Sequence, residues 1–179
     1  MRRVLLIPGW MKTIVLYDKK SGLEIRSGAI TQEIAEADCI FALSLAALTA
    51  LESAEKIKGK LILLNPPLPK RPLFDWLWRW FQYILHEGLF PQKQKFYWNP
   101  IKFIITLLNC IRLLRQDFSE TIRRFPKEKL VIIRGRKDIY FCDAETAALA
   151  KRWNIKILEV TGGHNWSSEM EAAIKKLTL

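Results

Sequence analysis

The sequence has no apolar run long enough to cross a membrane and no segment of low complexity. A transmembrane helix needs about eighteen or more consecutive apolar residues, and a polar, repetitive tract would indicate disorder. The amino-terminal apolar run, Val4 to Ile7, ends at Pro8, so it is shorter than the core of a secretory signal and is typical of a strand. We therefore expect the 179 residues to form one folded domain in the cytoplasm.

Cysteine and histidine are scarce. The three cysteines, Cys39, Cys110 and Cys142, lie far apart and lack the spacing of a metal motif, and their odd number favours a reduced, intracellular protein. Only two histidines are present, so a site that depends on an imidazole must use His86 or His164. We expect no metal and no organic cofactor.

Basic residues are in excess, and they are unevenly distributed. Lys and Arg number 29 and Asp and Glu 18, which gives a net charge of +11. The segment from Lys70 to Lys127 holds eleven basic and four acidic residues, so +7 of that charge lies there. Such a surface favours an acidic partner, although an ordinary solvated face explains it equally well. Nucleic acid is the least favoured partner, because the aromatic residues lie in apolar helical segments rather than on a basic sheet.

Short β-type runs alternate with helical patterns, which is typical of an α/β fold with a mostly parallel sheet flanked by helices. A helix is expected from Leu45 to about Ile57, another after Asp143, and a last one that begins at a capping box of Ser168 and Glu171. The expected strands are 4–7, 38–43, the stretch "KLILLNPPLP" until its prolines stop it, "LVIIRG" and 155–160, with 23–26 as a further candidate.

The alternation stops between "NPPLP" and "FPKEK" for about 58 helical, Trp-rich residues. From Pro72 onward, polar residues recur in one narrow stripe and leave most of the helix circumference apolar. A second lopsided helix begins at Asn99-Pro100. We predict a core formed by 1–69 and 128–179, with 70–127 inserted as a helical lid. The polar stripe of the first helix consists of Asp75, Arg79, Gln82 and His86.

The stretch "CIFALSLAAL" changes from a buried strand to a helix at Ser44. A single residue at such a junction is forced into a strained backbone conformation, and its neighbours two positions away must be small, as Ala42 and Ala46 are. This geometry lifts a hydroxyl above the sheet beside the amides that begin a helix. A serine that merely caps the helix would produce the same pattern.

Two further residues strengthen the catalytic interpretation of Ser44. His164 lies in a Gly-Gly loop directly after the last strand, whereas His86 belongs to the polar stripe. Asp138 follows the strand "LVIIRG", and its rival Asp143 is placed first of all to cap a helix. The order Ser, Asp, His, each just beyond a strand, is typical of one hydrolase architecture.

The same architecture needs two backbone donors for an oxyanion. One is the amide of Leu45, directly after the serine, and the other comes from the loop after the first strand, at Gly9-Trp10. We therefore predict Trp10 and Leu45 as the oxyanion donors. The competing interpretation is a binding protein that kept the fold and lost turnover.

The stretches "VLLIPGW", "IFALSLAAL", "IIRGRKD" and "TGGHNW", with a helical insertion after "LLNPP", resemble the α/β-hydrolase superfamily from end to end. Within it the chain is most similar to small lidded esterases, including those that demethylate pimeloyl-carrier-protein methyl ester in biotin synthesis. The sequence departs from the usual pattern where Pro8 replaces a His-Gly start and where Ala42 and Ala46 replace glycines. The antiparallel strands that begin larger members are absent.

The resemblance implies a serine hydrolase of an ester or thioester. The lid would line an acyl channel, with Trp76 and Trp80, although packing alone also explains the tryptophans. Its basic residues would receive a carboxylate, a phosphopantetheine phosphate or an acidic carrier protein. Contact with an anionic membrane is the alternative, and "PPLPKRP" is better explained by strand and helix boundaries than as a ligand motif. The basic candidates are Arg79, Arg112, Arg115, Arg123 and Arg124.

Overall fold

The computed structural model describes residues 3–9, 12–14, 31–87, 94–96 and 100–178. Within these residues the chain forms a five-stranded sheet with the order β1-β3-β4-β6-β7, and every neighbouring pair is parallel. The predicted α/β fold with a parallel sheet is therefore confirmed, whereas the candidate strand 23–26 lies outside the described residues. The strands are β1 (Val4–Ile7), β3 (Cys39–Leu43), β4 (Lys60–Leu64), β6 (Leu130–Gly135) and β7 (Lys156–Val160).

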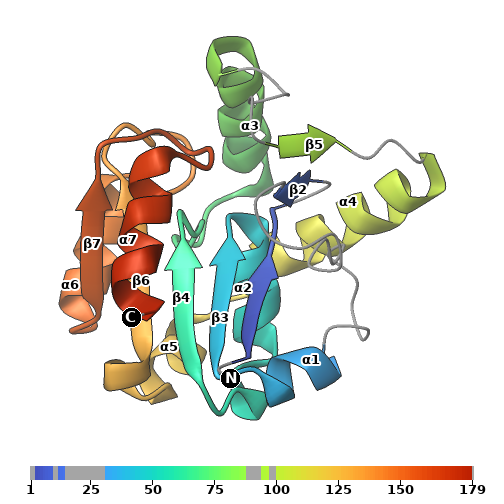
Figure 1. The fold of residues 1–179 in the computed structure, drawn as a ribbon. Coiled ribbons are helices and arrows are strands. Elements are labelled where there is room, and N and C mark those ends of the chain that lie inside the picture. Colours follow the sequence, from blue (N-terminus) through green and yellow to red (C-terminus); the bar gives the residue numbers. More distant parts are fainter. Residues whose placement is uncertain (1–2, 10–11, 15–30, 88–93, 97–99, 179) are drawn as a thin grey trace.

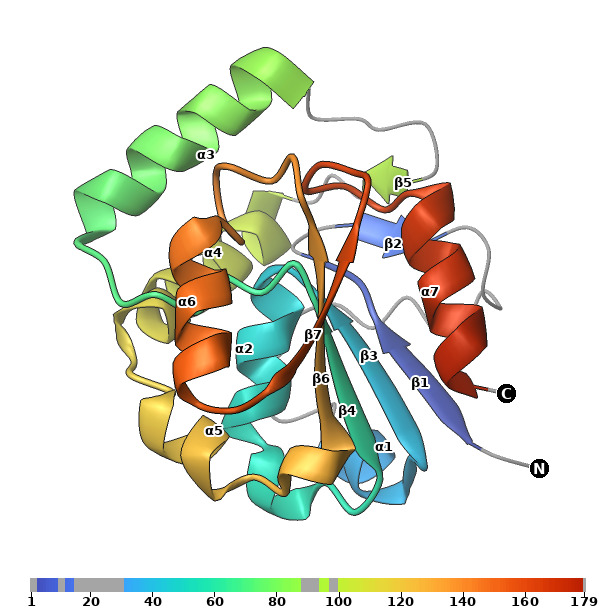
Figure 2. The ribbon, with the colours of Figure 1, turned by 90° about the vertical axis from the view of Figure 1, so that its left-hand side faces the viewer.

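Helices cover both faces of the sheet, as Figure 2 shows, with α7 on one side and α2, α5 and α6 on the other. The three central strands β3, β4 and β6 are mostly apolar, as expected for strands with both faces buried, whereas the edge strand β7 is only partly covered. Ile40 and Ala42 face the α2 side, and Phe41 and Leu43 face α7. Each fully buried large aliphatic side chain contributes about 1.5–3 kcal/mol. The helices are α1 (Thr31–Glu36), α2 (Leu45–Glu52), α5 (Ser119–Arg124), α6 (Ala144–Arg152) and α7 (Ser168–Thr178), with short 3-10 turns η2 (Ala54–Lys56) and η3 (Lys127–Lys129).

The segment inserted between β4 and β6 contains α3 (Leu73–Glu87), β5 (Gln94–Phe96) and α4 (Pro100–Arg115) before α5. Helix α3 stands above the carboxyl ends of the strands (Figure 1). Strand β5 pairs in an antiparallel manner with β2 (Lys12–Ile14). The expectation of a wholly helical insertion is therefore wrong at β5. Helical periodicity in a sequence gives no information about backbone pairing with a distant segment.

The last part of the insertion belongs to the core layer. Leu113 and Ile122 are completely buried and Phe118 is nearly so, and all three pack on the α2 side of the sheet. The predicted lid, 70–127, includes these three residues, although they pack in the core. The cap of α7 also differs by one position, because Ser167 rather than Ser168 accepts a hydrogen bond from the Met170 amide, at 3.3 Å.

Helix α3 carries an apolar face that is open to solvent. Its five exposed apolar side chains repeat at intervals of three and four residues, which places them on one side of the helix. In the described part of the chain, no helix is both long and apolar enough to cross a bilayer. The exposed residues are Phe74, Leu77, Trp78, Phe81 and Leu85 on α3, and Ile104, Ile105 and Leu108 on α4.

Candidate active site

Ser44 forms the junction between β3 and α2 and adopts a strained backbone. Its φ angle is 55° and its ψ angle −126°, and its hydroxyl makes no capping bond to α2. The Ser44 amide donates to the Leu64 carbonyl at 2.8 Å, which fixes the junction to β4. Ala42 and Ala46 are completely buried, as expected where a strand and a helix nearly touch. The hydroxyl is therefore free to face the carboxyl edge of the sheet.

Three side chains from distant parts of the chain meet at this edge. His164 Nε2 lies 2.8 Å from Ser44 Oγ, and His164 Nδ1 lies 2.6 Å from Asp138 Oδ2. Asp138 is completely buried and His164 is only 5% exposed. The hydroxyl, imidazole and carboxylate thus form one continuous hydrogen-bonded chain, in which Asp138 and His164 are buried and Ser44 is half-buried.

The loop after β6 is shaped to hold an ionised carboxylate. Asp138 Oδ1 accepts from the amides of Tyr140 and Phe141 at 3.1 and 3.0 Å, and Oδ2 accepts from the Cys142 amide at 3.2 Å. Burial of Asp138 disfavours its charge, but the adjacent His164 and the amide donors outweigh that cost and lower the pKa of the carboxyl. The buried side chain therefore carries a negative charge beside the imidazole.

Asn65, which follows β4, supports the histidine loop from below and was not predicted from the sequence. Its Nδ2 donates to the carbonyls of Gly163 and His164, both at 2.9 Å, and its Oδ1 accepts from the Gly135 amide at 2.7 Å. The residue is completely buried and has a φ angle of 46°. The only sequence signal was an Asn between a buried strand and two prolines, which equally indicates a turn.

Aromatic side chains surround the imidazole. The rings of Phe141 and His164 are 4.4 Å apart, and Tyr83 of α3 meets His164 edge-on at 5.4 Å. Trp76 is buried and stacks on Phe141 at 6.3 Å, whereas Trp80 is half-buried. The structure therefore brings Trp76 close to the histidine loop through Phe141.

The predicted oxyanion donors are described only in part. Leu45 is the first residue of α2, directly after Ser44, so its amide lies at the helix end that attracts negative charge. Trp10 lies outside the described residues. Its neighbour Gly9 lies close to Ser44, since a Cβ atom on Gly9 would lie 3.4 Å from Ser44 Cβ.

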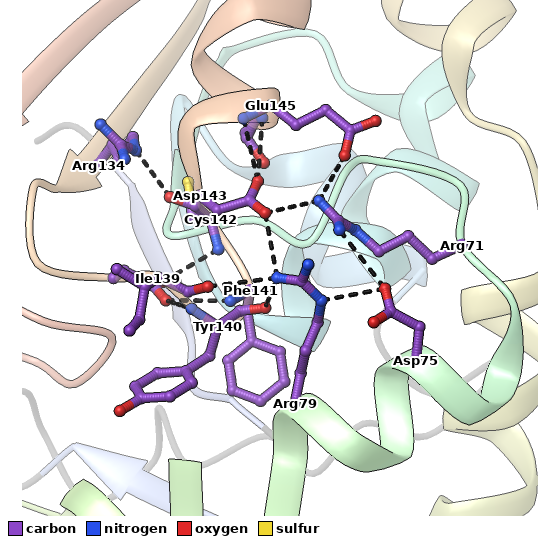
Figure 3. A network of polar contacts seen from close by, with 12 residues as sticks. Arg71, Asp75, Arg79, Arg134, Ile139, Tyr140, Phe141, Cys142, Asp143 and Glu145 are labelled. Carbon is purple, nitrogen blue, oxygen red and sulfur yellow. Dashed lines mark hydrogen bonds and ion pairs between the residues drawn. The ribbon is translucent and has the colours of Figure 1, made fainter. Parts of the chain in front are cut away.

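The basic residues predicted as substrate candidates make different contacts. Arg79 binds Asp75, Asp143 and two loop carbonyls (Figure 3), and Arg112 pairs with Glu52 at the surface. Arg115 is exposed at the end of α4. Both guanidinium groups thus hold intrachain acceptors, and the role of Arg79 and Arg112 in substrate binding stays a prediction.

The rival residues have other contacts. His86 Nδ1 lies 2.7 Å from the Gln82 carbonyl, and Asp143 caps α6 by accepting from the Glu145 and Thr146 amides. The three cysteines are buried, and none of them forms a disulfide. Across the described ranges, no three His, Cys, Asp or Glu side chains gather as a metal-binding group.

No known family profile and no curated protein matches the sequence. Among solved structures, the chain is similar to a carboxylesterase of the thaumarchaeon Nitrososphaera gargenis, with a TM-score of 0.53 and 12% identity over 78% of this chain and 64% of that chain. It is also similar to the thioesterase domain from the curacin biosynthetic pathway, with a TM-score of 0.51 and 19% identity over 83% and 68% of the two chains. The chain thus spans less than two thirds of that carboxylesterase.

At these identities the likeness shows the fold alone, an α/β fold that the chain shares with that carboxylesterase and that thioesterase domain. The fold that the predicted resemblance implies is thereby confirmed, whereas membership of the superfamily stays a prediction. The narrower resemblance to pimeloyl-carrier-protein methyl ester esterases stays a prediction.

Proposed function

We propose that the protein is a serine hydrolase that cleaves a carboxylic ester or thioester. The observation that carries the proposal is the hydrogen-bonded chain from Ser44 Oγ to His164 at 2.8 Å and from His164 to the buried Asp138 at 2.6 Å. Such a chain converts a weak hydroxyl into a nucleophile, because the base is already in hydrogen-bond contact and is oriented by a carboxylate.

Each residue has a defined role in this mechanism. The His164 Nδ1–H donates to Asp138, which leaves Nε2 to accept the Ser44 proton as Oγ attacks the carbonyl carbon. The protonated imidazole then gives that proton to the leaving group. A water molecule, activated by the same Nε2, releases the acyl group and regenerates the serine. The Leu45 and Trp10 amides would hold the oxyanion, and each such donor is worth about 10²–10³ in rate.

The substrate site would lie between Ser44 and the inserted segment, which we propose acts as a lid. Trp76 and Trp80 come from the helix that stands over the carboxyl edge of the sheet, and they would line the site of an acyl group. A carrier-linked acyl ester is the finer proposal, supported by the basic excess of the insertion and by Arg115 at its surface. An acidic carrier would be attracted by this charge, and the attraction would weaken with added salt.

The direct test is hydrolysis of p-nitrophenyl esters of graded chain length by the wild type and by Ser44→Ala. The wild type should turn over at least one ester, and the preferred length would measure the acyl site. Ser44→Ala should lower kcat by about four orders of magnitude, because the triad acts as a unit. A variant with near-normal turnover would move the chemistry away from Ser44, and an inactive wild type that binds an acyl ester would favour the binding-protein alternative.

A second candidate, an esterase that acts at a lipid surface, is favoured by the open apolar face of α3. Phe74 is 79% exposed and Leu85 is 63% exposed on the same helix that covers the site. Apolar and Trp-containing helix faces beside basic residues suit an anionic bilayer interface. The wild type should then float with anionic vesicles, and Phe81→Gln combined with Leu85→Gln should not. Equal flotation of both proteins, or flotation of neither, would contradict this candidate.

A further inference from the structure

Four side chains of α3 lie on one line along the helix and face the two loops that carry Asp138 and His164. Asp75, Arg79, Tyr83 and Glu87 are each four residues apart, so helical geometry stacks them on one side. This side is turned toward the core, and the exposed apolar face is turned away from it. The polar side of α3 therefore makes contacts within the protein.

The N-terminal part of the line holds the Asp138 loop. Arg79 Nη1 donates to the carbonyls of Ile139 and Tyr140 at 3.2 and 3.1 Å, and to Asp143 Oδ2 at 3.1 Å. Figure 3 shows this guanidinium inserted between the loop and Asp75, whose Oδ2 accepts from Arg79 Nε at 3.0 Å. The two carbonyls belong to the turn whose amides bind the Asp138 carboxylate. Arg79 thus fixes that turn from the outside.

The C-terminal part of the line holds the His164 loop. The Tyr83 hydroxyl donates to Asn165 Oδ1 at 2.5 Å, and Asn165 Nδ2 donates to Glu87 Oε2 at 3.0 Å. The Tyr83 ring also packs against the imidazole. Burial raises the pKa of Tyr83 to about 12, so its hydroxyl remains a donor at neutral pH. Asn165 directly follows His164, so these hydrogen bonds restrain the backbone that positions the imidazole.

We propose that α3 is a positioning element of the active site, in which Tyr83 and Glu87 act through Asn165 on His164, and Arg79 acts on the Asp138 loop. The inference rests on the proposed hydrolase function. The helix would set the distance from Nε2 to Oγ, and displacement of a reacting group by about 1 Å costs on the order of 10²-fold in rate. Movement of the same helix for substrate entry would then also loosen the base.

The test is a pair of complementary substitutions measured with a short p-nitrophenyl ester. Asn165→Asp places a second carboxylate beside Glu87, and its repulsion should lower kcat about tenfold while KM stays within twofold. Glu87→Gln alone should have a small effect, because an amide oxygen still accepts from Asn165. The double variant should recover most of kcat, since the new amide donates to the new carboxylate, which still accepts from Tyr83. Gln82→Ala, on the same helix but with a side chain outside this set of contacts, is the matched control.

Recovery in the double variant separates positioning from a loss of folding, and thermal unfolding of each variant is measured alongside. Tyr83→Phe keeps the ring on the imidazole and removes only the O–H, so it should lower kcat about threefold to tenfold even if Asn165→Asp does not fold. If the wild type is active and both Asn165→Asp and Tyr83→Phe keep kcat within twofold, the positioning role of α3 would be overturned. The proposed hydrolase function would still stand. A wild type that neither hydrolyses esters nor reacts with a fluorophosphonate would instead overturn the proposed function, and the inference with it.

Discussion

Two residues with positive φ angles, Ser44 and Asn65, end neighbouring strands and support the same site. Ser44 has φ 55° and Asn65 has φ 46°, values that cost a residue with a Cβ atom about 1–3 kcal/mol. The surrounding contacts keep both in place: the Leu64 carbonyl holds the Ser44 amide, and the Ile133 carbonyl holds the Asn65 amide at 2.9 Å. Asparagine tolerates this conformation better than most residues, whereas at Ser44 the strain itself is part of the junction that presents the hydroxyl.

Asn65→Ala should lower the free energy of unfolding by about 3 kcal/mol or more, because it leaves the buried Gly135 amide and two loop carbonyls without partners. Asn154→Ala is the matched control, since Asn154 has φ 54° but is exposed, and it should cost only about 1–2 kcal/mol. Urea unfolding measures both changes. Equal losses in the two variants would show that the side-chain bonds of Asn65 contribute nothing.

The lowered pKa of Asp138 predicts a stability change in acid. A carboxyl whose pKa is lower in the folded state than in the unfolded state stabilises the fold above the unfolded value of about 4, and that stability is lost as pH falls through the folded value. The free energy of unfolding of the wild type should therefore fall below about pH 4–5. Asp138→Asn should show a flatter curve over this range and a kcat lower by about 10³–10⁴ at pH 7. Parallel curves for the two proteins would contradict the assignment.

At the scale of elements, strand ends and loops fit together with little free space. Strand β6 ends at Gly135, where a Cβ atom would lie 2.3 Å from the Gly163 carbonyl oxygen and 2.6 Å from that of Gly162. The backbone amides of Arg136 and Lys137 donate to the Val160 and Gly162 carbonyls at 2.9 and 2.8 Å. The loop that carries His164 is therefore packed directly on the end of β6.

Gly135→Ala should displace this loop, because the clash is with backbone rather than with a flexible side chain. We expect kcat to fall by about 10²-fold and the melting temperature to decrease. Gly162→Ala, in the same loop, is the control: its nearest neighbour is the Ser167 hydroxyl at 3.1 Å, which can rotate away. Ester hydrolysis and thermal unfolding are the measurements, and a Gly135→Ala variant as active as the control would refute the packing argument.

The elements also show where sequence reasoning ended. The polar stripe of α3 was predicted from its spacing, but its docking partners were not, because Asp143 and the carbonyls of Ile139 and Tyr140 are more than fifty residues away along the chain. The pairing of β2 with β5 was missed for the same reason. The supporting role of Asn65 depends on three backbone groups that come together only in the folded sheet.

At the scale of the whole molecule, the alternation of β-type and helical runs was sufficient to predict the α/β class and the parallel sheet. The positions of Ser44, Asp138 and His164 could be predicted because parallel strands end at one edge, so residues just beyond them gather there. Periodicity could not show that residues 113–125 return to the core, since that depends on the space left beside α2. The catalytic roles themselves need a chemical measurement.

Reaction with a fluorophosphonate probe at neutral pH, with the modified residue located by mass spectrometry, tests the central claim most directly. Only a serine activated by a neighbouring base reacts readily, so the wild type should be labelled at Ser44, His164→Ala should react at least about 10²-fold more slowly, and Ser44→Ala should not react. An unlabelled wild type, or a label that persists in Ser44→Ala, would contradict the account.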